Sequence, residues 1–346
     1  RNGRELALPV PTRTVFADPR SVIDPVGVAH AVAGVLQLSP QAEVDLATKL
    51  QNKTSSFVYL ARQVDQEVAN AITSLKLKGV SSYRETGRAL TSGGLLAVVG
   101  RTDVDGVGIS GLELQYHDLL AGVDGRIERE VNSSGKSIAA GAGEVVEPVS
   151  GGRLTTTIDR TIQFQVDGIV KQQVERLGAR GGSAVVMDTK TGEIFAVSNI
   201  RRNEDGTYSS QSGNSAAVEA NEPGSVAKVF SVAAAINEGT IESDSKFSVP
   251  GSQVFDRGTK WEYPVTDAYP HGLEEMSVRK ILVDSSNLGT VLISRTLTTQ
   301  KNHEYLKLFG FGTKTEIKYP GEARGALRPV EKWQGTEKIT FAYGYG

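Results

Sequence analysis

A serine and a lysine three residues apart, Ser225 and Lys228, stand at the start of a predicted alanine- and valine-rich helix. Residues with this spacing are neighbours on one helix face, with Cβ atoms about 5–6 Å apart. A serine hydroxyl is a weak nucleophile and needs an adjacent base. Lysine becomes such a base when burial and the positive end of a helix lower its pKa from about 10.4 toward neutrality. The pair therefore predicts acyl chemistry at Ser225, whose own N–H can face a developing oxyanion.

The four-residue pattern S-x-x-K is weak evidence by itself. Ser133-Ser134-Gly135-Lys136 also fits it, within a polar stretch that offers no helix to fix the geometry. Any single match of this length is more often structural than catalytic.

A second motif, Ser285-Ser286-Asn287, follows Ser225 by roughly sixty residues, directly after a predicted apolar helix at Val278–Val283. A tight turn there would aim Ser285 and Asn287 at the nucleophile. Ser285 is suited to relaying a proton between Lys228 and a leaving amine, and Asn287 to orienting a substrate amide. A similar S-x-N at Ser212–Asn214 lies in a polar loop, which favours a structural role.

The elements before this site divide at a polar, glycine- and serine-rich stretch, Val131–Gly152, which predicts a boundary between residues 1–150 and residues 151–346. Ahead of it, residues 1–20 indicate irregular strands. The apolar spacing from Pro25 to Leu77 predicts helices, one of them beginning at Ser39-Pro40. A short strand at Leu95–Val99 and a helix at Leu112–Leu120 follow.

After the polar stretch, the sequence predicts a strand at Arg153–Asp159 and an amphipathic helix at Thr161–Leu177. Two apolar runs, Ser183–Met187 and Glu193–Asn199, flank a turn and predict a hairpin. Strands and helices continue downstream. The chain is therefore predicted to be α+β, with an antiparallel sheet in its second domain.

Composition excludes several classes of site. The 346 residues carry a formal net charge of −2, so nothing favours nucleic acid binding. The chain has no cysteine, which excludes thiolate metal sites and cysteine nucleophiles. Gly106–Gly111 reads G-x-G-x-x-G, but Arg101–Asp105 separates it from any strand, so a glycine-rich turn is favoured over a dinucleotide site. We expect neither a cofactor nor a metal.

The four histidines, His30, His117, His271 and His303, are scattered along the chain. A Ser-His-Asp arrangement using His271 and Asp267 stays open as a minor alternative, although no nucleophile turn adjoins them. His271 and Glu274 lack metal-ligand spacing. Trp261, Tyr263 and Tyr269 either line a substrate groove or pack within the domain.

In this order along the chain, the motifs resemble the class B penicillin-binding proteins. The resemblance runs from about Tyr83 to the end and is dense after Arg153. Its markers are Gly111–Glu113, Tyr116, Gly122–Gly125, Arg153–Asp159, Asp188–Ile194, Glu222–Ser225, Ser285–Asn287, Phe309–Gly312, Pro320–Glu322 and Gly344–Gly346. The resemblance implies a non-catalytic, dimerisation-type pedestal followed by a transpeptidase domain of the serine β-lactamase-like fold.

The family's third motif, K-T-G, follows S-x-N. Lys190-Thr191-Gly192 precedes Ser225 and occupies a hairpin turn, so it is not that motif. We expect the true K-T-G strand beyond Gly346, which leaves the transpeptidase domain incomplete and this fragment poorly active or inactive.

The resemblance implies a D,D-transpeptidase that cross-links peptidoglycan stem peptides ending in D-Ala-D-Ala, through an acyl-enzyme at Ser225 that β-lactams also form. The first domain is short compared with that of the elongation-type branch, which favours the division-type, FtsI-like branch, with a membrane glycosyltransferase and divisome proteins as partners. No apolar run is long enough to span a bilayer. We expect the chain at the extracytoplasmic face of the bacterial membrane, with a single-pass anchor upstream of Arg1.

Two other functions remain open at this point. One is a non-catalytic member of the family that binds peptidoglycan or acts as a scaffold in the division machinery. The other is a β-lactamase, although the sequence offers no recognisable deacylating carboxylate and the large first domain argues against it.

Overall fold

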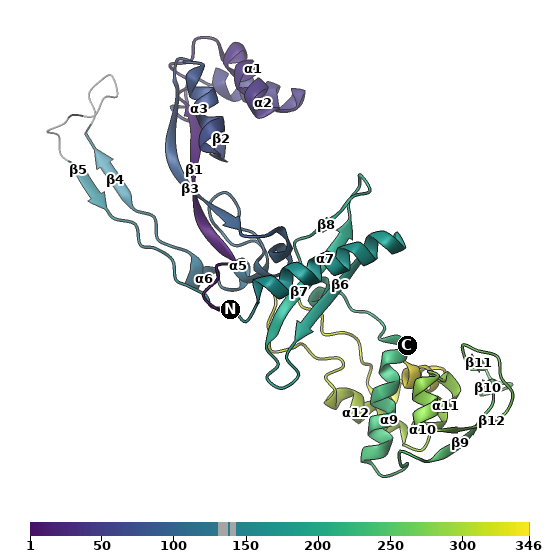
Figure 1. Ribbon diagram of the computed structural model, residues 1–346. Helices are drawn as coiled ribbons and strands as arrows, with labels where there is room; N and C mark the ends of the chain where they lie inside the picture. Colours follow the sequence, from purple (N-terminus) through teal and green to yellow (C-terminus); the bar gives the residue numbers. More distant parts are fainter. Residues whose placement is uncertain (131–137, 139–142, 346) are drawn as a thin grey trace. The chain divides into compact units, whose positions relative to one another are not determined.

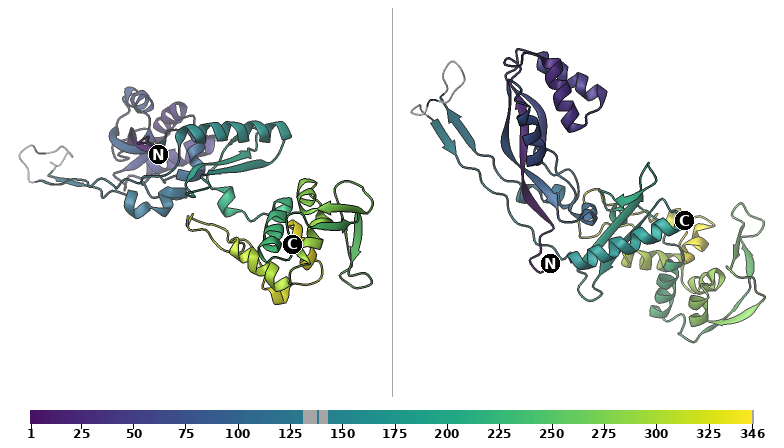
Figure 2. Two further views of the ribbon diagram at one scale, coloured as in Figure 1. Left: turned by 60° about the horizontal axis from the view of Figure 1, so that its bottom comes forward. Right: turned by 45° about the horizontal axis from the view of Figure 1, so that its top comes forward.

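The computed structural model describes residues 1–130, 138 and 143–345. These residues form two compact units, residues 1–216 and residues 217–346. Each unit has a hydrophobic core of its own. Figures 1 and 2 draw the chain from three directions.

The first unit begins with a three-stranded antiparallel sheet and three helices. The strand order is β2-β1-β3, and β1 pairs with β3 along its whole length. Helix α3 lies along this sheet (Figure 1). The elements are β1 (Ala7–Ala17), α1 (Pro25–Leu36), α2 (Pro40–Gln51), β2 (Val58–Val64), α3 (Gln66–Ser74) and β3 (Val80–Leu90).

Capping residues set where the first two helices begin. Asp24 accepts a hydrogen bond from the Gly27 N–H, and Ser39 accepts one from the Ala42 N–H. A proline at the first helical position follows each cap, where its missing N–H costs nothing. The predicted start at Ser39-Pro40 is confirmed.

The predicted helical region from Pro25 to Leu77 is wrong at Val58–Val64, which forms strand β2. This segment is rich in β-branched and aromatic residues, which fit a pleated surface. Tyr59 pairs with Phe16 of β1, and the Phe57 ring stacks on the Phe16 ring with centroids 4.9 Å apart. Pairing with β1 therefore outweighs the helix-like spacing.

The predicted strand at Leu95–Val99 is also wrong, because this segment is helical. Leu95, Val98 and Val99 are buried together with Ile158 and Val197. Positions i, i+3 and i+4 share a face only on a helix. The predicted helix at Leu112–Leu120 is present but divided at Tyr116. The elements are η1 (Gly93–Leu95), α4 (Leu96–Val99), α5 (Gly111–Gln115) and α6 (His117–Leu120).

Two short strands, β4 (Arg126–Arg129) and β5 (Gly143–Val146), pair antiparallel. The second lies within the stretch Val131–Gly152, which was predicted as a polar linker, so this stretch contains a strand. Ser133–Lys136, the first alternative S-x-x-K, lies outside the described residues.

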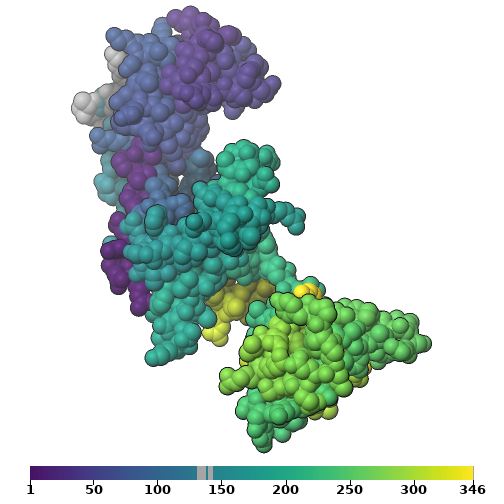
Figure 3. Space-filling view, turned by 45° about the vertical axis from the view of Figure 1, so that its right-hand side comes forward, coloured from purple at the N-terminus to yellow at the C-terminus, as the bar shows by residue number. Residues whose placement is uncertain are grey.

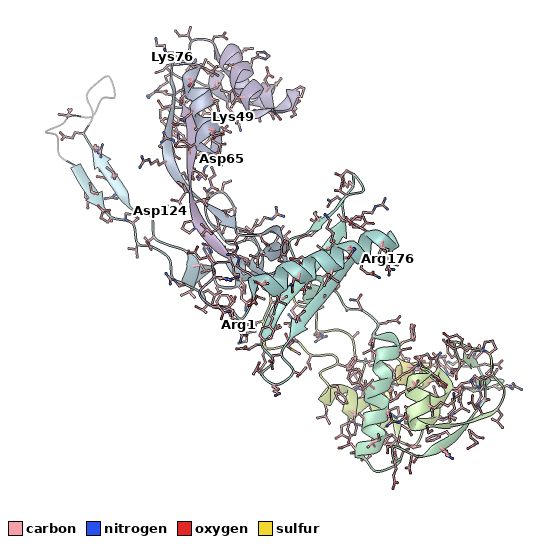
Figure 4. The ribbon with its side chains drawn as sticks, in the orientation of Figure 1. Arg1, Lys49, Asp65, Lys76, Asp124 and Arg176 are labelled. Atoms are coloured by element: carbon pink, nitrogen blue, oxygen red, sulfur yellow. The ribbon has the colours of Figure 1, made fainter. Side chains whose placement is uncertain are left out.

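The last part of the first unit is a helix on an antiparallel sheet of order β6-β7-β8. Its elements are α7 (Arg160–Leu177), β6 (Gly181–Met187), β7 (Ile194–Arg202) and β8 (Tyr208–Ser210). The predicted helix and hairpin are both confirmed. Asp159 caps α7 by accepting from the N–H groups of Thr161 and Ile162, and Arg176 occupies the last turn (Figure 4), where a cation suits the helix dipole.

The predicted strand at Arg153–Asp159 is wrong, because this segment belongs to no sheet. Two hydrogen bonds join this segment to β7. The Thr157 hydroxyl donates to the Ile194 carbonyl, and the Asp159 N–H donates to the Phe195 carbonyl.

The second unit packs helices and two small antiparallel sheets around one core. After α8 (Ser215–Val218), which straddles the two units, come η2 (Gly224–Ala227), α9 (Lys228–Asn237), β9 (Lys246–Val249), β10 (Ser252–Phe255), β11 (Tyr263–Thr266), β12 (Glu274–Ser277), α10 (Val278–Val283), α11 (Asn287–Ser294), α12 (Thr299–Leu308), η3 (Val330–Lys332), α13 (Glu337–Thr340) and η4 (Phe341–Tyr343). Val232, Ile281, Leu288 and Val291 are among the most buried side chains. Figure 3 colours the residues of this unit from green to yellow.

The predicted α+β class is confirmed. Every strand pair among the described residues is antiparallel. No helix within the described part of the chain has the length and apolar character to cross a membrane.

Candidate active site

Ser225 lies in the first turn of the alanine- and valine-rich helix, as predicted. This turn, η2, has 3₁₀ geometry, and α9 continues from it at Lys228. Ser225 is exposed, whereas Lys228 is only 2% exposed. The Lys228 N–H donates to the Ser225 carbonyl, so the two residues are one turn apart.

A segment near the end of the chain packs directly against this helix start. The Gly224 N–H donates to the Gly344 carbonyl over 3.0 Å, and the Ser231 hydroxyl donates to the Ala342 carbonyl over 2.9 Å. A Cβ on Gly344 would lie 2.0 Å from the Gly224 oxygen. Only glycine fits there. Gly346, the last residue of the corresponding motif, lies outside the described residues.

The Ser285-Ser286-Asn287 turn joins α10 to α11. The Ser286 N–H donates to the Ile281 carbonyl and the Ser285 N–H to the Leu282 carbonyl, which is a Schellman C-cap. Ser285 occupies the left-handed position of that cap with φ +55°, where glycine is usual. Ser286 then caps α11 by accepting from the Gly289 N–H over 2.8 Å.

This turn brings Ser285 to Lys228. The Lys228 Nζ lies 2.9 Å from the Ser285 Oγ and also donates to the Ser285 carbonyl. Burial lowers the pKa of Lys228, and the negative charge of Asp267 opposes that effect. Among the described residues, the Ser225 hydroxyl has no hydrogen-bond partner. Catalytic hydrogen bonds are often completed only when substrate binds.

Asn287 is held at the same junction. Its amide nitrogen donates to the carbonyl of Thr266, the last residue of β11, over 2.9 Å. The structure therefore brings together Lys228, Ser285 and Asn287, with Ser225 one turn away from Lys228.

Asp267 lies beside this group of residues, although its sequence position alone did not predict it there. Its carboxylate accepts from the Ser286 hydroxyl at 2.5 Å and from the Leu288 N–H at 2.9 Å, at the positive end of α11. These partners are about twenty positions away in the sequence, so no local pattern could reveal them.

The alternative Ser-His-Asp arrangement does not form. His271 Nε2 lies 3.1 Å from the Asp267 carboxylate, but the serine at that carboxylate is Ser286. Aspartate therefore stands between serine and histidine, whereas a triad needs histidine in the middle. No group of three potential metal ligands occurs among the residues that the structure describes.

The other motifs have structural roles. Lys190 and Thr191 donate their N–H groups to the Asp188 carboxylate, which forms the hairpin turn between β6 and β7. The Ser212 hydroxyl accepts from Arg101. Within Gly106–Gly111, Gly108 closes a turn with Thr102.

The aromatic residues considered for a groove differ in burial. Trp261 lies against Gly335 and Tyr263 against the core, so both pack within the domain. Tyr269 is 76% exposed.

The remaining histidines lie apart from this site. His30 contacts Glu43, His117 accepts from the Gly108 N–H, and His303 bonds to the Arg328 carbonyl.

Two family models match the chain: the penicillin-binding protein dimerisation domain over residues 1–156 and the penicillin binding protein transpeptidase domain over residues 182–346. The chain is 36% identical to penicillin-binding protein PbpB of Mycolicibacterium smegmatis, over 92% of this chain and 49% of that protein. It is 29% identical to peptidoglycan D,D-transpeptidase FtsI of Escherichia coli, over 100% of this chain and 58% of that protein. The chain thus spans about half the length of these relatives.

Among solved structures, penicillin-binding protein 3 of Mycobacterium tuberculosis, complexed with aztreonam, superposes with a TM-score of 0.62. The identity is 31%, over 76% of this chain and 55% of that chain. Family models, relatives and fold agree: this chain belongs to the class B penicillin-binding proteins.

Proposed function

We propose that this chain carries the nucleophile of a serine D,D-transpeptidase that cross-links peptidoglycan stem peptides. Ser225 Oγ attacks the carbonyl carbon between the two D-alanines, an acyl-enzyme forms, and D-alanine leaves. The amine of a second stem peptide then attacks the ester and takes the acyl group, which restores the serine. One observation carries the proposal: the buried Lys228, one helical turn after Ser225, has its Nζ 2.9 Å from Ser285 Oγ.

Each of the four residues has a separate role in this proposal. Neutral Lys228 takes the proton of the Ser225 hydroxyl, which its burial favours by lowering its pKa. Ser285 passes a proton to the leaving amine. Asn287, tethered to Thr266, orients the amide of the substrate. The Ser225 N–H at the helix start is one oxyanion donor.

We further propose that β-lactams acylate the same serine. Support comes from the aztreonam complex of the related penicillin-binding protein 3. The likeness to FtsI supports a role in septal wall synthesis at the extracytoplasmic membrane face, with a glycosyltransferase and divisome proteins as partners. A non-catalytic part over residues 1–150 would precede the transpeptidase part over residues 151–346, a division that the spans of the two family matches support.

The test uses the native protein that contains this chain, incubated with fluorescent penicillin and separated on a denaturing gel. The wild type and Ser212→Ala, which removes the serine of the alternative S-x-N motif, should both carry covalent label. Ser225→Ala should carry none. An unlabelled wild type would favour the non-catalytic scaffold, and equal label on Ser225→Ala would place the nucleophile elsewhere. Sustained turnover of a chromogenic cephalosporin would instead indicate a β-lactamase.

A further inference from the structure

Three donors converge on one buried carboxylate beside the proposed nucleophile site. The Asp267 side chain is 5% exposed and accepts from the Ser286 hydroxyl, the Leu288 N–H and His271 Nε2. Two of these bonds tie the end of β11 to the turn that carries Ser285. The third comes from a residue to which the proposed mechanism gives no role.

His271 meets an acceptor at each ring nitrogen. Nε2 lies 3.1 Å from the Asp267 carboxylate, and Nδ1 lies 2.7 Å from the Gly272 carbonyl. Neither a carboxylate nor a carbonyl can donate a proton, so both ring nitrogens must do so. Only the imidazolium form has two N–H donors. The hydrogen bond that His271 donates to Asp267 raises the pKa of His271, which agrees with this geometry.

The backbone of His271 is fixed as well. Gly251, which precedes β10, packs so closely on it that a Cβ there would lie 2.0 Å from the His271 carbonyl oxygen. The Asp267 N–H donates to the Gly251 carbonyl. The loop between Asp267 and His271 is thus anchored at both ends.

We propose that His271, as an imidazolium, is a positioning residue for this site: it holds the Asp267 carboxylate against the Ser286 turn and balances its negative charge beside Lys228. The consequence for acylation rests on the proposed function. The charge balance matters because an uncompensated carboxylate would favour the protonated form of Lys228, and a protonated lysine cannot accept the Ser225 proton.

Other charges near His271 act in the same direction. Glu274 of β12 also raises the pKa of His271, and its own carboxylate lies 3.3 Å from Lys280. Gly251, which precedes β10, contributes no charge, and Ser286 contributes none from the turn. Asp267 and Glu274 are therefore the groups that set the protonation of His271, and Lys228 is the group that responds to it.

The matched variants are His271→Gln and His271→Ala in the native protein that contains this chain, with His30→Gln as a control. Glutamine can still donate to Asp267 but carries no charge. His30 also pairs with a carboxylate, Glu43, but lies in the first unit. The protonation of both side chains can be measured without any acylation, by an NMR pH titration of ¹³Cε-labelled Lys228 and of the His271 ring nitrogens.

In the wild type, His271 should be mostly imidazolium at about pH 6.5, the ordinary midpoint of a histidine. Lys228 should titrate at higher pH in both His271 variants and at the wild-type pH in His30→Gln. The pH dependence of acylation by penicillin should change in parallel, with the acidic limb of the rate profile moved to higher pH in the His271 variants. The acylation rates of the wild type and of His271→Gln should converge at alkaline pH.

A neutral His271 at about pH 6.5, or an unchanged Lys228 titration in His271→Gln, would overturn the proposal. A loss of acylation that is equal at every pH would do the same, because it would indicate a role in folding alone. The titration remains informative if the wild type is not acylated, so a failure of the proposed function is distinguishable from a failure of this inference.

Discussion

At the scale of single residues, burial shifts the protonation equilibrium of Lys228. Its side chain is almost fully enclosed, its Nζ bonds to Ser285, and its pKa is lowered by desolvation. An exposed lysine would be protonated at neutral pH and could not take a proton from Ser225. Desolvation therefore shifts Lys228 toward the neutral form that the proposed mechanism requires.

Acylation by penicillin should therefore rise with pH through the lowered pKa of Lys228. Above that pKa the amine is neutral, and below it the ammonium cannot accept a proton. Lys228→Ala should lower the acylation rate by about 10²–10⁴-fold, and Lys228→Arg by a similar factor, because a guanidinium does not deprotonate. Stopped-flow acylation across pH measures both effects.

The matched control is Lys190→Ala, which alters the lysine of the hairpin K-T-G and should retain the wild-type profile. If Lys228→Arg acylates at the wild-type rate, Lys228 is not the base.

At the scale of elements, the turn between α10 and α11 places a non-glycine residue where glycine is favoured. Ser285 has a positive φ so that its hydroxyl can reach Lys228. A left-handed conformation costs an L-residue about 1–2 kcal/mol. We expect the hydroxyl to offset this cost through its contact with Lys228.

Ser285→Gly and Ser285→Ala separate these two contributions. Both variants lose the hydroxyl, so both should lose acylation to the same extent. Glycine relieves the left-handed strain, so Ser285→Gly should exceed Ser285→Ala in free energy of unfolding by about 1 kcal/mol. Denaturant unfolding compares the two, and equal stabilities would show that the position is not strained.

The close approach of α10 and α11 depends on Gly289. A Cβ there would lie 2.6 Å from the Ile281 side chain. Gly289→Ala should destabilise the second unit by about 1–3 kcal/mol through overpacking. Gly168→Ala is the control, since the added Cβ at this exposed position of α7 meets nothing and should stabilise the helix by about 0.5–1 kcal/mol. Thermal unfolding of both variants is the measurement, and a neutral Gly289→Ala would mean that the two helices can move apart.

Local sequence signals predicted those helices, caps and turns whose structure depends on residues nearby in the chain. They failed for segments whose structure depends on partners far away in the sequence. The helix at Val278–Val283, the cap at Ser39 and the hairpin around Asp188–Gly192 follow from spacing and turn residues. Strand β2 was missed because its partner β1 lies more than forty positions earlier. Asp267 was missed for the same reason, because its donors come from Ser286 and Leu288.

At the scale of the whole molecule, the two units have separate cores. Ile72 is fully buried in the first unit, among residues such as Val15 and Leu50. The four proposed catalytic residues all belong to the second unit. Stability of the first unit and acylation at Ser225 should therefore be separable.

Ile72→Ala should destabilise the first unit by about 2–5 kcal/mol, the usual cost of such a cavity. Below its unfolding transition, the variant should still be acylated at the wild-type rate. Calorimetry and penicillin labelling on the same sample test this, and a parallel loss of labelling under conditions where the fold persists would contradict independent cores.

The central claim is that Ser225 is the residue that becomes acylated. The most direct measurement is peptide mapping by mass spectrometry after the native protein has reacted with a β-lactam. We predict that the added mass lies on the Ser225 hydroxyl and disappears in Ser225→Ala. An adduct on Ser285, Ser286 or any residue other than Ser225 would contradict this account.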